Sequence, residues 1–202
     1  NLYKGIVTSL LFSPLSATTH ELFVGTSGKG LRVLNTADSS VSAATMPSSP
    51  QSFAITALAA SPAFAQDGTL FAGTSRMGLF ASRDGGKTLA DSSVGITNSR
   101  VNAVAVSPAF GTDRTVFFGT AYQGVARTLD GGKTVAYCNN GLADDSILQV
   151  VVSPAYAVDQ TVAAGTDGGG LFLSTSRGDS WKSVGGFSGY AIPWVSFAPD
   201  YA

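Results

Sequence analysis

Short apolar runs, separated by glycine, proline, aspartate and serine, divide this chain along its whole length. Each run has about four to seven residues and is rich in β-branched and aromatic side chains, as at 55–59, 69–74 and 101–106. No stretch keeps apolar residues at the spacing of three and four that an amphipathic helix requires. The pattern therefore predicts strands throughout the chain and almost no helix.

The order of runs and turns recurs about every 46 residues, which makes the chain an internal repeat. A Ser-Pro dipeptide follows the first run of each copy, and Ala198-Pro199 takes its place in a fifth. The dipeptides begin at Ser13, Ser61, Ser107 and Ser153. Four short strands in about 45 residues are typical of one blade of a β-propeller. We predict an all-β, single-domain propeller with repeats at about 6–52, 53–99, 100–145 and 146–190 and the start of a fifth at 191–202.

The first run of each repeat is apolar on both faces. This favours the innermost strand of a blade, which is packed between neighbouring sheets. One blade cannot bury both of its faces alone, so we expect the stability of the fold to come from stacking of the repeats.

An aspartate recurs at the end of the turn that follows each Ser-Pro dipeptide, at Asp67, Asp113 and Asp159. In the first repeat we assign His20 to this position. One aspartate per repeat does not supply the six or more oxygen ligands that calcium takes. We therefore predict that these side chains cap their turns by accepting backbone hydrogen bonds.

A second recurring turn joins the third and fourth runs, with the sequence SRDGGKT at 82–88 and TLDGGKT at 128–134. Its aspartate can accept hydrogen bonds from turn N–H groups, and its glycines permit positive φ. At 174–181 the turn reads STSRGDSW, with serine at the aspartate position and a terminal tryptophan. Leu89 and Val135 occupy the tryptophan position of the other two turns, so we expect those turns to be less well anchored.

These turns resemble the Asp-box (BNR) repeat, Ser/Thr-x-Asp-x-Gly-x-Thr-Trp. Together with the Ser-Pro turns, the resemblance extends over most of the chain. The proteins that the chain resembles are sialidase-like and photosystem-assembly-factor-like bacterial repeat proteins. It implies a propeller fold, but one fold serves many functions. The positions that match the motif, to which the resemblance gives a structural role, are Ser82, Asp84, Gly86, Thr128, Asp130, Gly132, Ser174, Gly178 and Trp181.

Composition narrows the function further. Only 12% of residues are charged and the formal net charge is −1, so no basic field is available for nucleic acid. No run reaches the roughly 18 apolar residues of a membrane span. Cys138 is the single cysteine, which excludes an intramolecular disulfide, and we expect no metal and no cofactor. A charge-poor, Ser/Thr-rich composition favours an extracellular, cell-surface or periplasmic bacterial protein.

Four repeats and one further strand leave the closure of the ring open. The chain can be part of a longer propeller, can assemble with another copy or subunit, or can close a small ring in which the fifth inner strand overlaps the first. An open ring exposes an apolar blade face. We therefore expect a protein partner or self-association through the open blade faces, with a glycan as a further candidate partner.

Functional chemistry is expected where the repeats differ. In a propeller the turns between second and third strands share one end of the blades with the linkers between blades, and this end is the usual binding surface. The candidate residues there are Lys29, Arg76, Tyr122, Gln123, Asp144, Asp145 and Asp167. The alternative is that they are ordinary solvated turn residues.

Two hydrolase chemistries can be compared with these residues. A sialidase site needs a glutamate beside its tyrosine nucleophile, and the one glutamate, Glu21, belongs to the Ser-Pro end, so this chemistry is disfavoured. A xyloglucanase-type site needs two opposed aspartates, which Asp144 or Asp145 with Asp167 would supply, unless these residues only shape turns. We expect a non-catalytic interaction or scaffold propeller within a larger assembly. Carbohydrate binding or hydrolysis is the alternative, and assembly-factor work on a membrane complex is a third reading that rests on the resemblance alone.

Overall fold

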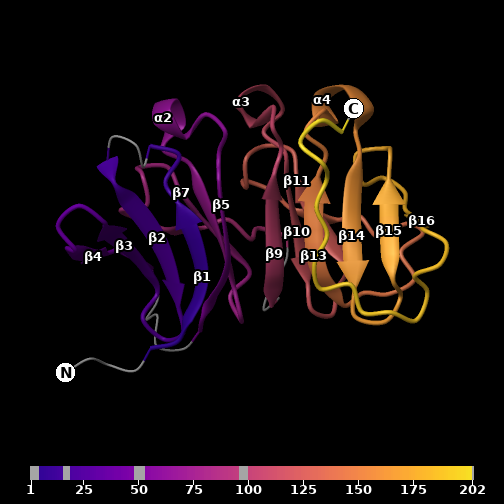
Figure 1. The fold of residues 1–202 in the computed structure, drawn as a ribbon, viewed down its shortest axis with the longest axis horizontal. Helices are drawn as coiled ribbons and strands as arrows, with labels where there is room; N and C mark the ends of the chain where they lie inside the picture. Colours follow the sequence, from indigo (N-terminus) through magenta and orange to yellow (C-terminus); the bar gives the residue numbers. More distant parts are fainter. Residues whose placement is uncertain (1–4, 16–18, 48–52, 96–99, 202) are drawn as a thin grey trace.

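The protein folds as four antiparallel sheets, each made of four strands that are consecutive in the chain (Figure 1). The computed structural model describes residues 5–15, 19–47, 53–95 and 100–201. Blade 1 consists of β1 (Val7–Phe12), β2 (Glu21–Thr26), β3 (Leu31–Asn35) and β4 (Val41–Ala43), and blade 2 of β5 (Ile55–Ala60), β6 (Leu70–Thr74), β7 (Leu79–Ser82) and β8 (Ala90–Asp91). Blade 3 consists of β9 (Val101–Val106), β10 (Val116–Thr120), β11 (Val125–Thr128) and β12 (Ala136–Tyr137), and blade 4 of β13 (Ile147–Val152), β14 (Val162–Thr166), β15 (Leu171–Ser174) and β16 (Lys182–Ser183). This confirms the predicted all-β propeller architecture.

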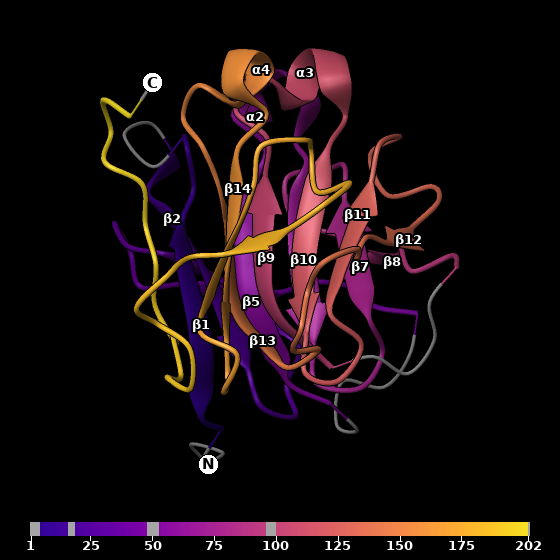
Figure 2. The ribbon, with the colours of Figure 1, turned by 90° about the vertical axis from the view of Figure 1, so that its right-hand side faces the viewer.

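The blades radiate from their first strands. In Figure 1, β1, β5, β9 and β13 lie toward the middle of the molecule, and β4 and β16 lie at its two lateral margins. Three one-turn helices, α2 (Phe64–Asp67), α3 (Phe110–Asp113) and α4 (Tyr156–Asp159), sit together at one end of the blades (Figures 1 and 2). We call this the helix end, and the opposite end, which carries the turns between second and third strands, the turn end.

The helix end is built from the Ser-Pro turns, and the predicted aspartate caps are confirmed. In blade 2, Ser61 Oγ donates to Asp67 Oδ2 at 2.7 Å, and the Thr69 amide donates to Asp67 Oδ1 at 2.8 Å. The same pair of contacts recurs at Asp113 and Asp159. The short helices between serine and aspartate differ from the predicted plain turns.

The residue after each aspartate has a left-handed backbone conformation. Gly68, Arg114 and Gln160 have φ of 57°, 53° and 55°, and His20 has φ of 55°. His20 therefore occupies this left-handed position, and Thr19 stands where the other repeats have aspartate. Our assignment of His20 to the aspartate position was wrong by one residue.

The inner strands of blades 2 to 4 each begin with an aliphatic residue that lies directly on a glycine of the preceding blade. A Cβ built on Gly73 would meet Val101 Cγ1 at 2.6 Å, and one built on Gly119 would meet Ile147 Cγ2 at 2.4 Å. Gly25 is approached in the same way by Ile55. Because the contact leaves no room for a Cβ, glycine in the second strand sets the distance between neighbouring blades.

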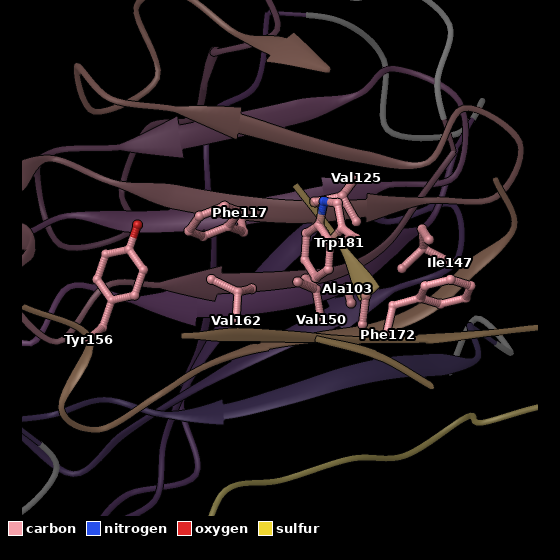
Figure 3. Close-up of a cluster of buried hydrophobic side chains, with 10 residues drawn as sticks. Ala103, Phe117, Val125, Ile147, Val150, Tyr156, Val162, Phe172 and Trp181 are labelled. Carbon is pink, nitrogen blue, oxygen red and sulfur yellow. The ribbon is translucent and has the colours of Figure 1, made fainter. Parts of the chain in front are cut away.

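Aromatic pairs complete the contact between blades at the helix end. Phe71 of blade 2 meets Phe110 of blade 3 edge to face, with ring centroids 5.6 Å apart, and Phe117 meets Tyr156 of blade 4 at 5.9 Å. Phe23 and Phe64 make the equivalent pair between blades 1 and 2. Figure 3 shows the cluster between blades 3 and 4, in which such rings are packed with aliphatic side chains. The core is therefore distributed over the blade interfaces.

The glycine contact predicts the effect of adding one methyl group. Gly119→Ala should lower the free energy of unfolding by about 1–3 kcal/mol, because the new Cβ overfills the site under Ile147. Gly111→Ala is the control, because nothing lies within 4 Å of the Cβ that it would add. Urea denaturation measures both variants. Equal stability of the two would contradict the role given to Gly119.

Candidate functional site

The candidate residues from the sequence are spread around the turn end. Arg76, Tyr122, Gln123 and Asp167 are exposed and Lys29 is half-buried, so that each blade contributes from its own second-to-third turn. Tyr122 keeps 79% of its surface exposed. The structure brings the two linker residues of this set into contact with turns. Asp144 contacts the turn of blade 4, and Asp145 contacts the turn of blade 3.

Asp144 holds the linker after blade 3 to the turn of blade 4. Its Oδ2 accepts hydrogen bonds from the amides of Gly168 at 2.9 Å and Gly169 at 2.7 Å, and its Oδ1 accepts one from Ser146 at 2.9 Å. Partial burial raises the pKa of this carboxyl, but these backbone hydrogen bonds outweigh the burial and lower the pKa below its ordinary value. The arrangement makes Asp144 a stable carboxylate that fixes a turn.

Neighbouring contacts at the turn end are also structural. The Gly124 amide donates to the Asp145 carbonyl at 2.8 Å, which joins the turn of blade 3 to the same linker. The Gln123 side-chain Oε1 accepts a hydrogen bond from the Tyr137 hydroxyl at 2.6 Å, and the Gln123 backbone carbonyl accepts one from Asn139 Nδ2. Tyr122 is left as the exposed ring of this region.

The Asp-box-like turns lie at the helix end and form the hydrogen bonds expected of their aspartates. Asp84 Oδ1 accepts from Ser82 Oγ at 2.7 Å and from the Thr88 amide at 2.9 Å, while Oδ2 accepts from Thr88 Oγ1 at 2.6 Å. Ser82 Oγ also accepts from the Gly86 amide at 2.8 Å. Asp130 makes the same contacts with Thr128 and Thr134. These side chains have a structural role.

In the fourth turn Ser176 replaces the aspartate and accepts fewer hydrogen bonds from the turn backbone than Asp84 does. Ser176 Oγ accepts from the Ser180 amide at 3.1 Å, and Ser174 Oγ accepts from the Gly178 amide at 2.9 Å. The tryptophan compensates, because Trp181 is buried between blades 3 and 4 and its Nε1 donates to the Cys138 carbonyl at 2.6 Å (Figure 3). Burial raises the pKa of the Cys138 thiol to about 12, which keeps it protonated and unreactive.

Leu89 and Val135 take the tryptophan position in blades 2 and 3. Both are buried, and their amides pair with the preceding linker, Leu89 with the Thr45 carbonyl at 2.8 Å and Val135 with the Val94 carbonyl at 2.9 Å. The smaller side chains are therefore packed, although neither supplies the side-chain hydrogen bond that Trp181 makes.

A cavity of about 320 Å³ opens at the helix end between blades 3 and 4, a feature that the sequence reasoning missed. It is lined by Asp113, Thr115, Tyr156 and Arg177, among others. Tyr156 is buried, and its hydroxyl has no hydrogen-bond partner in the described parts of the chain. Burial raises the pKa of this phenol to about 12, and the positive charge of Arg127 offsets the rise in part.

The largest departure from the regular pattern is the outer face of blade 1. Val7 is 54% exposed, although the equivalent Ile55, Val101 and Ile147 of the other inner strands are 0% exposed. Val41, at the tryptophan position of blade 1, is 60% exposed. Leu10 and Phe12 of β1 are exposed at 61% and 66%. These four side chains, Val7, Leu10, Phe12 and Val41, form the open face of blade 1. In the sequence Val7 looks like Ile55, Val101 and Ile147, so no sequence signal could have located this face.

Residues 5–15, 19–47, 53–95 and 100–201 contain neither a cluster of metal-binding side chains nor a membrane-spanning helix. None of their His, Cys, Asp and Glu side chains gather in a group of three or more that is placed to hold a metal ion. Their helices are all too short and too polar to cross a membrane.

No protein-family model matches the chain, and no curated protein matches its sequence. Solved structures do match. An ancestral GH74 enzyme superposes with a TM-score of 0.69 at 18% identity, covering 90% of this chain and 24% of the enzyme. The GH74 xyloglucanase from Xanthomonas campestris gives 0.66 at 20% identity, covering 92% and 31%. A computationally designed protein, Ika8, gives 0.66 at 15% identity, covering 97% and 54%.

The chain thus spans from about a quarter to about half the length of these structures. At such identities the likeness concerns the fold, and it agrees with the four blades described above. The chain is built as a β-propeller is built, from radially stacked four-stranded sheets.

The hydrogen bonds of Asp84 predict a dependence of stability on acid pH. They lower its pKa from 3.8 to about 2 against the opposing effect of burial, so they stabilise the fold above pH 3.8 and this contribution is lost as pH falls through about 2. Asp84→Asn should therefore melt below wild type at neutral pH, and the gap should narrow near pH 2. Melting curves against pH measure this, with the exposed Asp200→Asn as the control. A gap that stays constant with pH would contradict the assignment.

The unpaired hydroxyl of Tyr156 predicts a stabilising substitution. Phe64 and Phe110 hold the same position in blades 2 and 3, so Tyr156→Phe should raise the free energy of unfolding by about 1 kcal/mol. Tyr122→Phe, at an exposed ring, should change it little. Urea denaturation compares the two. A clear loss of stability in Tyr156→Phe would show that the hydroxyl has a partner after all.

Proposed function

We propose that this chain is a non-catalytic interaction module that docks into a larger bacterial cell-surface or extracytoplasmic assembly through the open face of blade 1. The observation that carries the proposal is the exposure of Val7, Leu10, Phe12 and Val41. Positions equivalent to Val7 and Val41 are buried in each of the other three blades.

The burial of these equivalents explains why the face favours a protein partner. Burial of apolar surface stabilises by roughly 25 cal/mol per Å², and contiguous exposed apolar patches mark interaction sites. Residues at Val7-equivalent positions pack on the glycine of a preceding blade. The open face is therefore already shaped to receive the surface of another blade.

The role of Asp144 also favours this function over hydrolysis. An opposed pair of carboxylates would need Asp144 or Asp145 to face Asp167 with free oxygens. Both oxygens of Asp144 accept backbone hydrogen bonds, and its Oδ2 bonds lead to the glycines directly after Asp167. Asp145 alone of the two linker carboxylates stays exposed.

Carbohydrate binding at the turn end is a second candidate. Its support is the fold likeness to GH74 enzymes together with Tyr122, an exposed ring of the kind that stacks on sugar faces. Under this alternative, soluble xyloglucan binds wild type, Tyr122→Ala weakens binding at least tenfold, and Leu129→Ala at the helix end does not. Release of reducing sugar that disappears in Asp145→Ala would extend this candidate to catalysis.

The proposed function predicts a selective loss of assembly. Wild-type protein from its native source should migrate in a complex heavier than the chain alone, and Leu10→Glu should migrate as the free chain, because a buried carboxylate opposes docking. Val158→Glu is the matched control, since Val158 is 86% exposed on α4, away from the open face. Equal melting temperatures would show that both variants are folded. Recovery of Leu10→Glu in the wild-type complex would refute the proposed docking face.

A further inference from the structure

Residue sizes at the blade interfaces follow a rule. The second strand of blades 1 to 3 presents a phenylalanine to the next blade, and the next inner strand ends in a small residue that packs in the same cluster. The pairs are Phe23 with Ala60, Phe71 with Val106, and Phe117 with Val152. Large therefore meets small at each of these three interfaces, as close packing requires.

The rule reverses at blade 4. Its second strand, β14, has the buried Ala163 at the phenylalanine position. The segment 191–201 lies beside blade 4 in Figure 1, and its residue at the small position is Phe197. The two substitutions compensate each other in size. Phe197 also meets Tyr201 with ring centroids 4.7 Å apart, which places an aromatic pair within this segment.

The register of segment 191–201 supports this comparison. Ile192 lies on Gly165 as Ile147 lies on Gly119, and the Ile192 amide donates to the Thr166 carbonyl at 2.8 Å. Burial then alternates, because Val195 and Phe197 are partly buried and Trp194 is 77% exposed. The segment therefore occupies the place of a fifth inner strand.

Blade 1 has the same signature as this segment. Val7, Leu10 and Phe12 of β1 align with Ile192, Val195 and Phe197, so Phe12 is a second phenylalanine at the otherwise small position. Phe12 needs a partner with a small residue at the phenylalanine position. In this chain Ala163 of blade 4 is that residue. The surface that fits the open face of blade 1 is thus the face of blade 4 that segment 191–201 now covers.

We propose that the open face of blade 1 binds blade 4 of a second copy of this chain, with Val7, Leu10 and Phe12 taking the places of Ile192, Val195 and Phe197. This inference rests on the proposed docking function and names its partner. Segment 191–201 competes with the second copy for β14.

The geometry of the contact points to a closed dimer. The interface is head-to-tail, and such interfaces form rings where the rotation closes. The four blades in the described residues of each copy would make eight in a dimer of this chain, which is within the range of about four to eight found in propellers. In a single copy the face of blade 1 is open and the face of blade 4 is covered by segment 191–201 alone, whereas the ring would cover both faces with a blade.

The contact is also built to be exchangeable. At the three internal interfaces a polar side chain of the inner strand donates to the first carbonyl of the next inner strand. The donors are Thr8, Thr56 and Asn102. Blade 4 has Leu148 at this position, which has no donor. Neither occupant of β14 therefore receives the side-chain hydrogen bond that joins the inner strands at the three internal interfaces.

Sedimentation of the purified 202-residue chain at several concentrations tests the proposal. We expect a monomer–dimer equilibrium in wild type. In the Ile192→Asp background, where the competing segment is weakened, Ala163→Phe should raise the dimer dissociation constant at least tenfold, because two phenylalanines then meet in one space. In the same background, the double variant Phe12→Ala/Ala163→Phe should restore dimerisation, because it recreates the large–small pair of the internal interfaces. Ile192→Asp should tighten the dimer, because it weakens the competing segment.

Melting temperatures establish that each variant is folded. A wild-type chain that stays monomeric at every concentration, or an Ile192→Asp/Ala163→Phe variant that dimerises as Ile192→Asp does, would overturn the inference. If the chain is monomeric while Leu10→Glu still leaves the native complex, the docking function stands and its partner is another protein. If Leu10→Glu is still recovered in the native complex, the docking function itself fails.

Discussion

The fold depends on one close approach that is repeated between blades. An aliphatic side chain at the start of the inner strand of blades 2 to 4 rests on a glycine of the preceding second strand, as Val101 does on Gly73 and Ile147 on Gly119. The missing Cβ lets the sheets come together, and the aromatic pairs at the helix end complete the contact. Because no blade buries its own faces, each one is stable only between neighbours. The contact that joins neighbouring blades therefore also favours binding at any blade face that lacks a neighbour.

Function follows from how the two ends of the row differ. Blade 4 is covered by segment 191–201, whose Ile192 repeats the glycine contact at Gly165. No segment among the described residues covers blade 1 in this way, and Val7 is exposed where its equivalents are buried. The turn end, by contrast, is occupied by structural hydrogen bonds such as those of Asp144. The proposed docking surface is apolar, and it lies at the end of the array, apart from the turns where propellers usually bind.

Much of the architecture could be predicted from the sequence, because strand runs, Ser-Pro turns and Asp-Gly-Gly turns repeat with fixed spacing. The one-turn helices could not, since four residues give no helical period. Arg114 and Gln160 gave no signal of their left-handed backbone, which is why His20 was placed one residue away from its true position. For the site, an exposed blade face was expected, but its residues required knowledge of which faces are covered. The bonds of Asp144 depend on a linker without repeat symmetry, so only the structure reveals them.

The central claim is that the side chains of β1 are covered by another blade when the protein functions. Hydroxyl-radical footprinting measures this directly, because oxidation reports the solvent exposure of individual side chains. In concentrated protein or in the native complex, Leu10 and Phe12 should be protected, and dilution to the isolated chain should expose them, while Tyr122 at the turn end should be oxidised equally in both states. Leu10 and Phe12 that remain as reactive in the native complex as in the dilute chain would contradict the account.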